Sequence, residues 1–185
     1  MQFVRTRVED RIRSVCGTTD RFTLLLRGGD VLRYHAEGRH LQPQSVAEHT
    51  WRMLVILLHL WPNSSKELIL AVLYHDVAEC YTGDFPRNSK DYPGLQAILN
   101  RMKDEFHDYV NVYDAGPLSE LEYFRYKLVD ILEVYITSKA QVTPRAKDVE
   151  ARAWLIIKDC IPYLEDEGQK LVNDFLSKLG GSGGE

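Results

Sequence analysis

Several kinds of feature are scarce in this chain of 185 residues, and each absence excludes a class of protein. The three cysteines, Cys16, Cys80 and Cys160, are odd in number and form no metal-binding or redox pattern, so we expect reduced thiols. No apolar run approaches the ~18 residues of a membrane-spanning helix, and the first residues lack the apolar region of a signal peptide. The sequence therefore predicts a soluble, cytoplasmic protein without a membrane partner.

Basic residues are fewer than acidic ones, with 23 Lys and Arg against 27 Asp and Glu. The net charge of -4 gives the chain no basic field with which to hold long nucleic acid. A local group of Arg and Lys could still bind a small phosphate. The length, with 44% hydrophobic and 27% charged residues, fits one soluble domain with a substantial core.

Strand alternation is rare, whereas helical periodicity recurs along the chain. Ser45, followed three residues later by Glu48, forms a capping-box pattern at the start of one helix. The periodicity predicts an all-α fold, with one domain over residues 1–179 and a flexible tail over 180–185. Residues 28–43, rich in Gly and charge, are predicted to form a long functional loop. The predicted helices cover residues 45–61, 66–81, 94–110, 117–139, 148–160 and 165–179.

The segment YHDVAECYTGDFP places several ionisable groups directly after the apolar run LILAVLY. His75, Asp76 and Glu79 are three or four residues apart, so we expect all three on one side of the last helical turns. Burying carboxylates is costly, but a divalent cation would make it favourable. The alternative for each residue is a solvated helix end. Asp130 and His49 weaken that alternative because both occur in apolar helices.

Together, His49, His75, Asp76 and Asp130 offer two imidazoles and two carboxylates. This donor set suits Mn, Fe, Co or Zn and does not choose among them. The order of a His, a later His-Asp pair and a distant Asp resembles the HD-domain metal-dependent phosphohydrolases. The segments VAEHT, YHDVAECYTGDFP and KLVDIL resemble, more closely, the 5'-deoxynucleotidase branch and its phage relatives, which include dATP triphosphohydrolases.

The resemblance implies a single HD-domain helical bundle with a buried metal site. Its implied metal ligands are His49, His75, Asp76 and Asp130. Glu79 would be the catalytic carboxylate, and Asp84 a second catalytic carboxylate, which touches the sugar. Arg33 and Lys90 would bind phosphates, and Tyr34, where the nucleotidases have Trp, would lie against the deoxyribose. Mg on the phosphate tail, a homo-oligomer and, for a phage-encoded protein, the host cytoplasm are further implications.

Three functions follow from this pattern. The first is a dNTP triphosphohydrolase that releases a deoxynucleoside and triphosphate, with dATP as the substrate type. A triphosphate tail needs several cations, which the chain offers at Arg33, Arg39, His40, Arg87 and Lys90. The second is a 5'-deoxynucleotidase acting on dNMPs, and the third is a non-catalytic protein that binds metal and nucleotide. Glu79 favours an enzyme, because a binding module has no need of a carboxylate that orients water.

Overall fold

A computed structural model describes residues 7–34, 41–86, 89, 92–111 and 117–180 of the chain. Helices dominate these residues, and the all-α prediction is confirmed. The helices are α1 (Val8–Cys16), α2 (Arg21–Asp30), α3 (Val46–Leu60), α4 (Lys66–Tyr74), α5 (Glu79–Thr82), α7 (Leu95–Val110), α8 (Glu120–Lys139), α9 (Pro144–Cys160), a 3₁₀ turn η2 (Ile161–Tyr163) and α10 (Asp166–Lys178). None of the helices in this described part is long and apolar enough to span a membrane.

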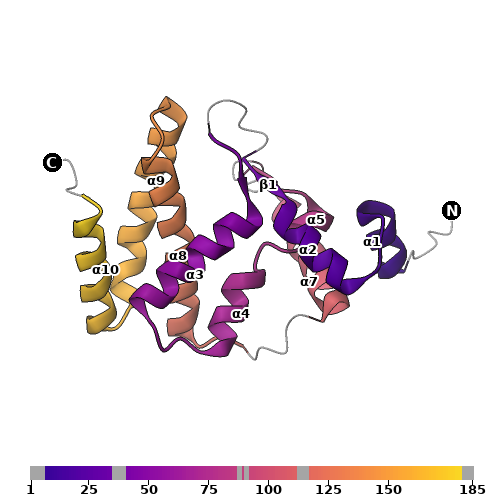
Figure 1. The fold of residues 1–185 in the computed structure, drawn as a ribbon, viewed down its shortest axis with the longest axis horizontal. Coiled ribbons are helices and arrows are strands. Elements are labelled where there is room, and N and C mark those ends of the chain that lie inside the picture. The colour runs from indigo at the N-terminus through magenta and orange to yellow at the C-terminus, as the bar shows by residue number, and fades with distance from the viewer. Residues whose placement is uncertain (1–6, 35–40, 87–88, 90–91, 112–116, 181–185) are drawn as a thin grey trace. The chain divides into compact units, whose positions relative to one another are not determined.

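The chain divides into two compact units, and the first comprises Met1–Thr50 and Leu73–Gly116. In this unit α1, α2, α5 and α7 contact one another, as can be followed in Figure 1. Their apolar faces bury a shared core that includes Ile12, Leu24, Tyr81 and Phe106. Burial of this area is the main favourable term that holds the four helices together.

The second unit comprises Trp51–Val72 and Pro117–Glu185. Here α8 packs against α9, and the 3₁₀ turn η2 links α9 to α10. A larger core joins these helices with α4 and the second part of α3, around Met53, Leu57, Leu132 and Ile157. The prediction that residues 1–179 form one domain stays a prediction. Of the predicted flexible tail, residues 181–185 lie outside the described part.

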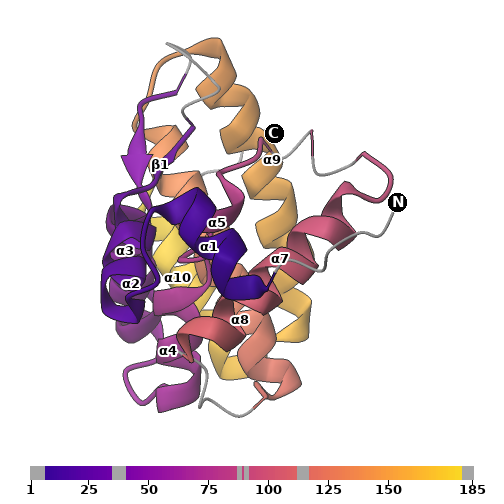
Figure 2. The same ribbon diagram turned by 90° about the vertical axis from the view of Figure 1, so that its right-hand side faces the viewer.

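A short antiparallel strand pair stands at the base of the predicted loop. Strand β1 (Leu32–Arg33) pairs with β2 (Gln44–Ser45), and Leu32 lies opposite Ser45. Figure 2 shows β1 following the end of α2. The prediction of a loop from residue 28 is wrong at its start, because Gly28 and Gly29 belong to α2. Residues 35–40, which include His35, Arg39 and His40, lie outside the described part.

Two helices precede the first one that the periodicity predicts. The side chain of Asp20 accepts a hydrogen bond from Thr23 N at 2.8 Å and so caps α2, and Gly17 ends α1 in the left-handed conformation. Two predicted starts are also displaced: α8 begins after a capping box formed by Ser119 and Glu122, and α9 begins after a Thr143 cap. In each case a short polar residue decides where the helix begins.

Candidate metal centre

A buried and a partly buried histidine face each other in the first unit. His49 lies in the first turn of α3 and is 0% exposed, and His75 directly follows α4. Their ring centroids are 5.3 Å apart, with the planes tilted by 55°. Ser45 fixes the start of α3, as the capping pattern predicts, because its hydroxyl accepts a hydrogen bond from Glu48 N at 3.0 Å. This cap determines which turn of α3 carries His49.

His75 and Asp76 occupy a tight turn, and the prediction of one helix from residue 66 to residue 81 is wrong. The helix stops at Tyr74, and a hydrogen bond from Val77 N to Tyr74 O (3.2 Å) replaces the α-helical pattern. A second such bond joins Glu79 N to Asp76 O at 2.9 Å, after which α5 begins. The three site residues therefore do not share one helix face.

Helix α2 packs directly on this turn. At Gly28 a β-carbon would lie only 2.6 Å from Val77 O and 2.9 Å from Val77 Cα, so only glycine permits the approach. Val77 itself is buried in the core of the first unit. Tertiary packing of the turn thus replaces the helical continuation that local periodicity favours.

Asp76 is a partly buried carboxylate with cationic neighbours. Its Oδ2 lies 3.1 Å from His75 Nε2 and its Oδ1 lies 3.3 Å from Lys103 Nζ. Burial by itself would raise the pKa of Asp76, but His75, Lys103 and Arg33 together hold this pKa well below its usual range. The ionised form of a carboxylate is the form that binds a cation.

Glu79, the predicted catalytic carboxylate, is the first residue of α5 and is only 4% exposed. Gly83, with a φ of 81°, ends this short helix and donates its N–H to Glu79 O at 2.8 Å. The neighbouring Cys80 is partly buried and packs against the core of the first unit, where Cys16 Sγ lies 3.4 Å from Cys80 O. Burial raises the pKa of the Cys80 thiol to about 12, so this thiol is no nucleophile.

The predicted nucleotide-binding residues gather at the strand pair. Arg33 donates from Nη1 to Gln44 Oε1 at 3.1 Å, and its guanidinium lies 5.2 Å from the centre of the Tyr34 ring. Tyr34 adopts a left-handed φ of 62°, and its N–H donates to Asp84 Oδ2 at 3.0 Å. Arg33, Tyr34 and Asp84 thus form one connected group. Lys90 and Arg87 lie outside the described residues.

In the described part of the chain, one group of side chains could hold a metal ion. It consists of His49, His75 and Asp130, whose ligand atoms all lie within 4.8 Å of one another. The prediction of a metal-binding centre in an all-α fold is thereby confirmed. Asp76 is not a member of this group, although it contacts His75, so its role as a fourth ligand stays a prediction.

Two residues near the centre carry no signal in the sequence. Lys103 on α7 contacts Asp76, yet nothing in its surroundings distinguishes it from the other charged residues of that amphipathic helix. His107, also on α7, is half-buried, and burial lowers its pKa. The partly buried Asp76 calls for a cationic partner, but the sequence cannot say which helix supplies it.

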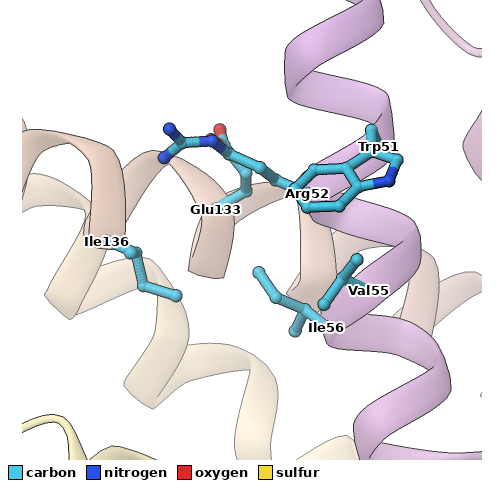
Figure 3. A pocket seen from close by; sticks show the side chains of 6 residues that line it. All are labelled: Trp51, Arg52, Val55, Ile56, Glu133 and Ile136. Carbon is cyan, nitrogen blue, oxygen red and sulfur yellow. The ribbon is translucent and has the colours of Figure 1, made fainter.

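A separate pocket of ≈ 300 Å³ lies in the second unit. Figure 3 shows Trp51, Val55 and Ile56 on α3 facing Glu133 and Ile136 on α8, with Arg52 reaching across. Glu133 is buried there, and the hydroxyl of Thr137 donates to its Oε1 at 2.6 Å. None of the predicted site residues lines this pocket.

Comparison with known proteins supports the resemblance read from the motifs. Residues 30–109 match the family model described as HD domain. The matched range includes every predicted site residue except Asp130. A comparison with curated proteins finds no match.

A solved structure shares the fold. It is that of the HD phosphohydrolase DatZ of cyanophage S-2L, bound to dA and one catalytic Zn²⁺ ion, with a TM-score of 0.71 and 21% sequence identity. The match covers 86% of this chain and 96% of the cyanophage chain. The predicted resemblance to HD-domain proteins is confirmed in fold and in the matched domain.

Proposed function

We propose, from the premise that the chain carries an HD domain, that it is a metal-dependent phosphohydrolase of deoxynucleotides. The observation that carries the proposal is the convergence of His49, His75 and Asp130 on one point, next to Asp76, whose Oδ2 lies 3.1 Å from His75 Nε2. A catalytic carboxylate, Glu79, follows within the same segment. The similarity to a phage phosphohydrolase that binds dA supports a purine deoxynucleotide as the substrate.

The donor set fits a divalent transition metal. Two imidazoles and one or two carboxylates leave positions open for water and for a substrate oxygen, as in catalytic sites that hold Mn, Fe, Co or Zn. A divalent ion held there would acidify a water molecule and polarise a phosphoryl oxygen. In this proposal His49, His75, Asp76 and Asp130 hold the ion.

Glu79 orients the attacking water and accepts its proton. The Glu79 carboxylate is shielded from bulk solvent, so few solvent molecules compete with the attacking water for its oxygens. Helix α5 and the turn that carries Asp76 hold Glu79 in place. Arg33 neutralises the charge that develops on the transferred phosphoryl group, because a phosphoryl transition state spreads negative charge over its oxygens. Lys90 supplies a second cation from the segment after Asp84.

The substrate is a dNTP, most closely dATP, and the products are the deoxynucleoside and triphosphate. The cations at Arg33, Arg39, His40, Arg87 and Lys90 outnumber what a monophosphate requires. Mg on the phosphate tail would assist them.

The expected setting is the host cytoplasm for a phage-encoded chain. The expected assembly is a homo-oligomer, which light scattering would test.

The decisive experiment is incubation with each dNTP and each dNMP in the presence of Mn or Co, with the products separated by chromatography. Deoxynucleoside and triphosphate from dATP would support the proposal. Orthophosphate released from dNMPs alone would make the protein a 5'-deoxynucleotidase. Binding of metal and nucleotide without any product would identify a non-catalytic protein.

A further inference from the structure

Lys103 reaches the candidate metal centre from a helix that carries none of the predicted site residues. It lies in the middle of α7, and its Nζ atom is 3.3 Å from Oδ1 of Asp76. The Asp76 side chain is 15% exposed and that of Lys103 is 25% exposed, so solvent screens this ion pair less than a surface pair. The contact joins α7 to the turn after α4, across 27 positions of sequence.

The two oxygens of Asp76 have different neighbours. Oδ2 lies 3.1 Å from His75 Nε2, whereas Oδ1 contacts Lys103. Donor atoms bound about 2.1 Å from one metal ion are roughly 3 Å apart when they stand at right angles. The spacing between Oδ2 and Nε2 fits two ligands on a common ion, as it also fits an ion pair of Asp76 with a protonated His75, and Oδ1 is the oxygen turned toward α7.

We propose that Lys103 is a positioning residue of the metal centre, which holds Oδ1 of Asp76 and so presents Oδ2 alone, beside His75, to a metal ion. This inference rests on the proposed function, since it assigns Asp76 to the metal. An aspartate carboxylate rotates over a broad range about its last torsion and can bind a cation through one oxygen or two. A charge-assisted hydrogen bond to Oδ1 selects one orientation and one binding mode.

Lys103 has two opposite effects on the affinity of the centre for a metal ion. Its positive charge repels a divalent cation, so removal of the charge alone would tighten metal binding. Its hold on Asp76 organises the ligand, so removal of the contact would weaken metal binding. Partners that orient metal ligands typically contribute 10- to 100-fold in affinity. The proposal requires that the positioning of Asp76 raises metal affinity by more than the charge of Lys103 lowers it.

The test compares Lys103→Met, which keeps an apolar stem, with Arg101→Met on the same helix. Arg101 is 79% exposed at its side chain and pairs with Glu105 at 3.2 Å, so its variant removes the same charge without touching Asp76. Affinity for Zn²⁺ and Co²⁺ is measured by competition with a chelator. We expect a loss of roughly 10- to 100-fold in Lys103→Met and no change in Arg101→Met.

A second readout does not depend on affinity. The visible spectrum of bound Co²⁺ reports the number and arrangement of its ligands, so freeing Oδ1 should change the spectrum of Lys103→Met at saturating metal. Lys103→Arg, which retains charge and donors, should keep the parent affinity and spectrum, and Lys103→Gln, which removes the charge, takes the place of the Met variant if that variant misfolds. Unchanged or tighter metal binding with an unchanged spectrum in Lys103→Met would overturn the role of Lys103 while leaving the proposed function intact. Failure of the unmutated protein to bind either metal would overturn both.

Discussion

The Nε2 atom of His75 lies 3.1 Å from Oδ2 of Asp76, although adjacent residues of a regular helix would direct their side chains apart. The relationship exists because the chain leaves the helix after Tyr74 and makes a tight turn. A turn can place two consecutive side chains on one point, which a helix cannot. In this chain the adjacent His75 and Asp76 meet where the helix is interrupted.

The first prediction concerns metal content. The purified chain should hold about one divalent transition metal, since the described residues include a single candidate ligand group. His75→Ala and Asp130→Ala should both lose it, because each removes one donor. Elemental analysis measures the stoichiometry, and His59→Ala, an exposed histidine of α3, is the control. Stoichiometric metal in Asp130→Ala would mean that another residue completes the site.

The second prediction separates binding from turnover. Glu79→Gln should retain metal and bind nucleotide nearly as the parent does, while turnover falls by roughly 10²-fold or more, the usual effect of losing a general base. The amide preserves the size of the buried side chain, so the core of the first unit stays filled. Single-turnover kinetics and nucleotide titration measure the two quantities. Turnover within a few-fold of the parent would remove Glu79 from the proposed mechanism.

The sequence predicts the chemistry of the centre better than its geometry. His49, Asp130 and the His75-Asp76 pair are recognisable because ionisable residues are unusual among apolar neighbours. The break after Tyr74 is not recognisable, because its cause is the close approach of Gly28 to Val77, 49 positions later in the chain. The sequence does not predict the role of Lys103 for the same reason. The packing of α7 brings Lys103 to Asp76, and no local sequence pattern indicates this contact.

The third prediction tests this packing. Gly28→Ala should destabilise the protein by about 1–3 kcal/mol, the cost of overpacking a filled site, because the new methyl group would meet Val77 O at 2.6 Å. A gain in helix propensity of about 1 kcal/mol opposes this loss without cancelling it. Gly29→Ala is the matched control, since its methyl group would lie 3.2 Å from Ala47 Cβ. Chemical denaturation should rank Gly28→Ala clearly below Gly29→Ala, and equal stabilities would contradict the proposed cause of the turn.

The fourth prediction concerns acid stability. Burial, assisted by Lys103, lowers the pKa of His107 below its ordinary value of 6.5. The unfolded chain takes up this proton at about pH 6.5, whereas the folded chain does so only at lower pH. The contribution of His107 to stability is therefore complete above about pH 6.5 and is lost as the pH falls through its folded pKa.

The variant His107→Asn removes this titration. The decrease in Tm between pH 7 and pH 5, measured in the presence of a chelator, should be smaller in His107→Asn than in the parent protein. His59→Asn, at an exposed position, should leave the decrease unchanged. Parallel pH profiles for His107→Asn and the parent would show that His107 takes up its proton equally in both states.

The last prediction concerns discrimination between deoxyribose and ribose. Tyr34 is held at a φ of 62°, a conformation that costs a non-glycine residue on the order of 1 kcal/mol. The hydrogen bond from Tyr34 N to Asp84 Oδ2 helps to offset this cost. If the Tyr34 ring lies against the sugar, Asp84 acts on selectivity by holding Tyr34 in place.

Two substitutions distinguish that role from direct contact with the sugar. Asp84→Asn keeps an oxygen that can accept the Tyr34 N–H, whereas Asp84→Ala removes it. Asp84→Ala should lower the ratio of kcat/KM for dATP over ATP by about 10-fold, equivalent to one lost hydrogen bond of about 1.4 kcal/mol, and Asp84→Asn should keep most of the ratio. Equal losses in both variants would mean that the charge of Asp84 is what matters, through direct contact with the sugar, and that the anchoring of Tyr34 contributes nothing to selectivity.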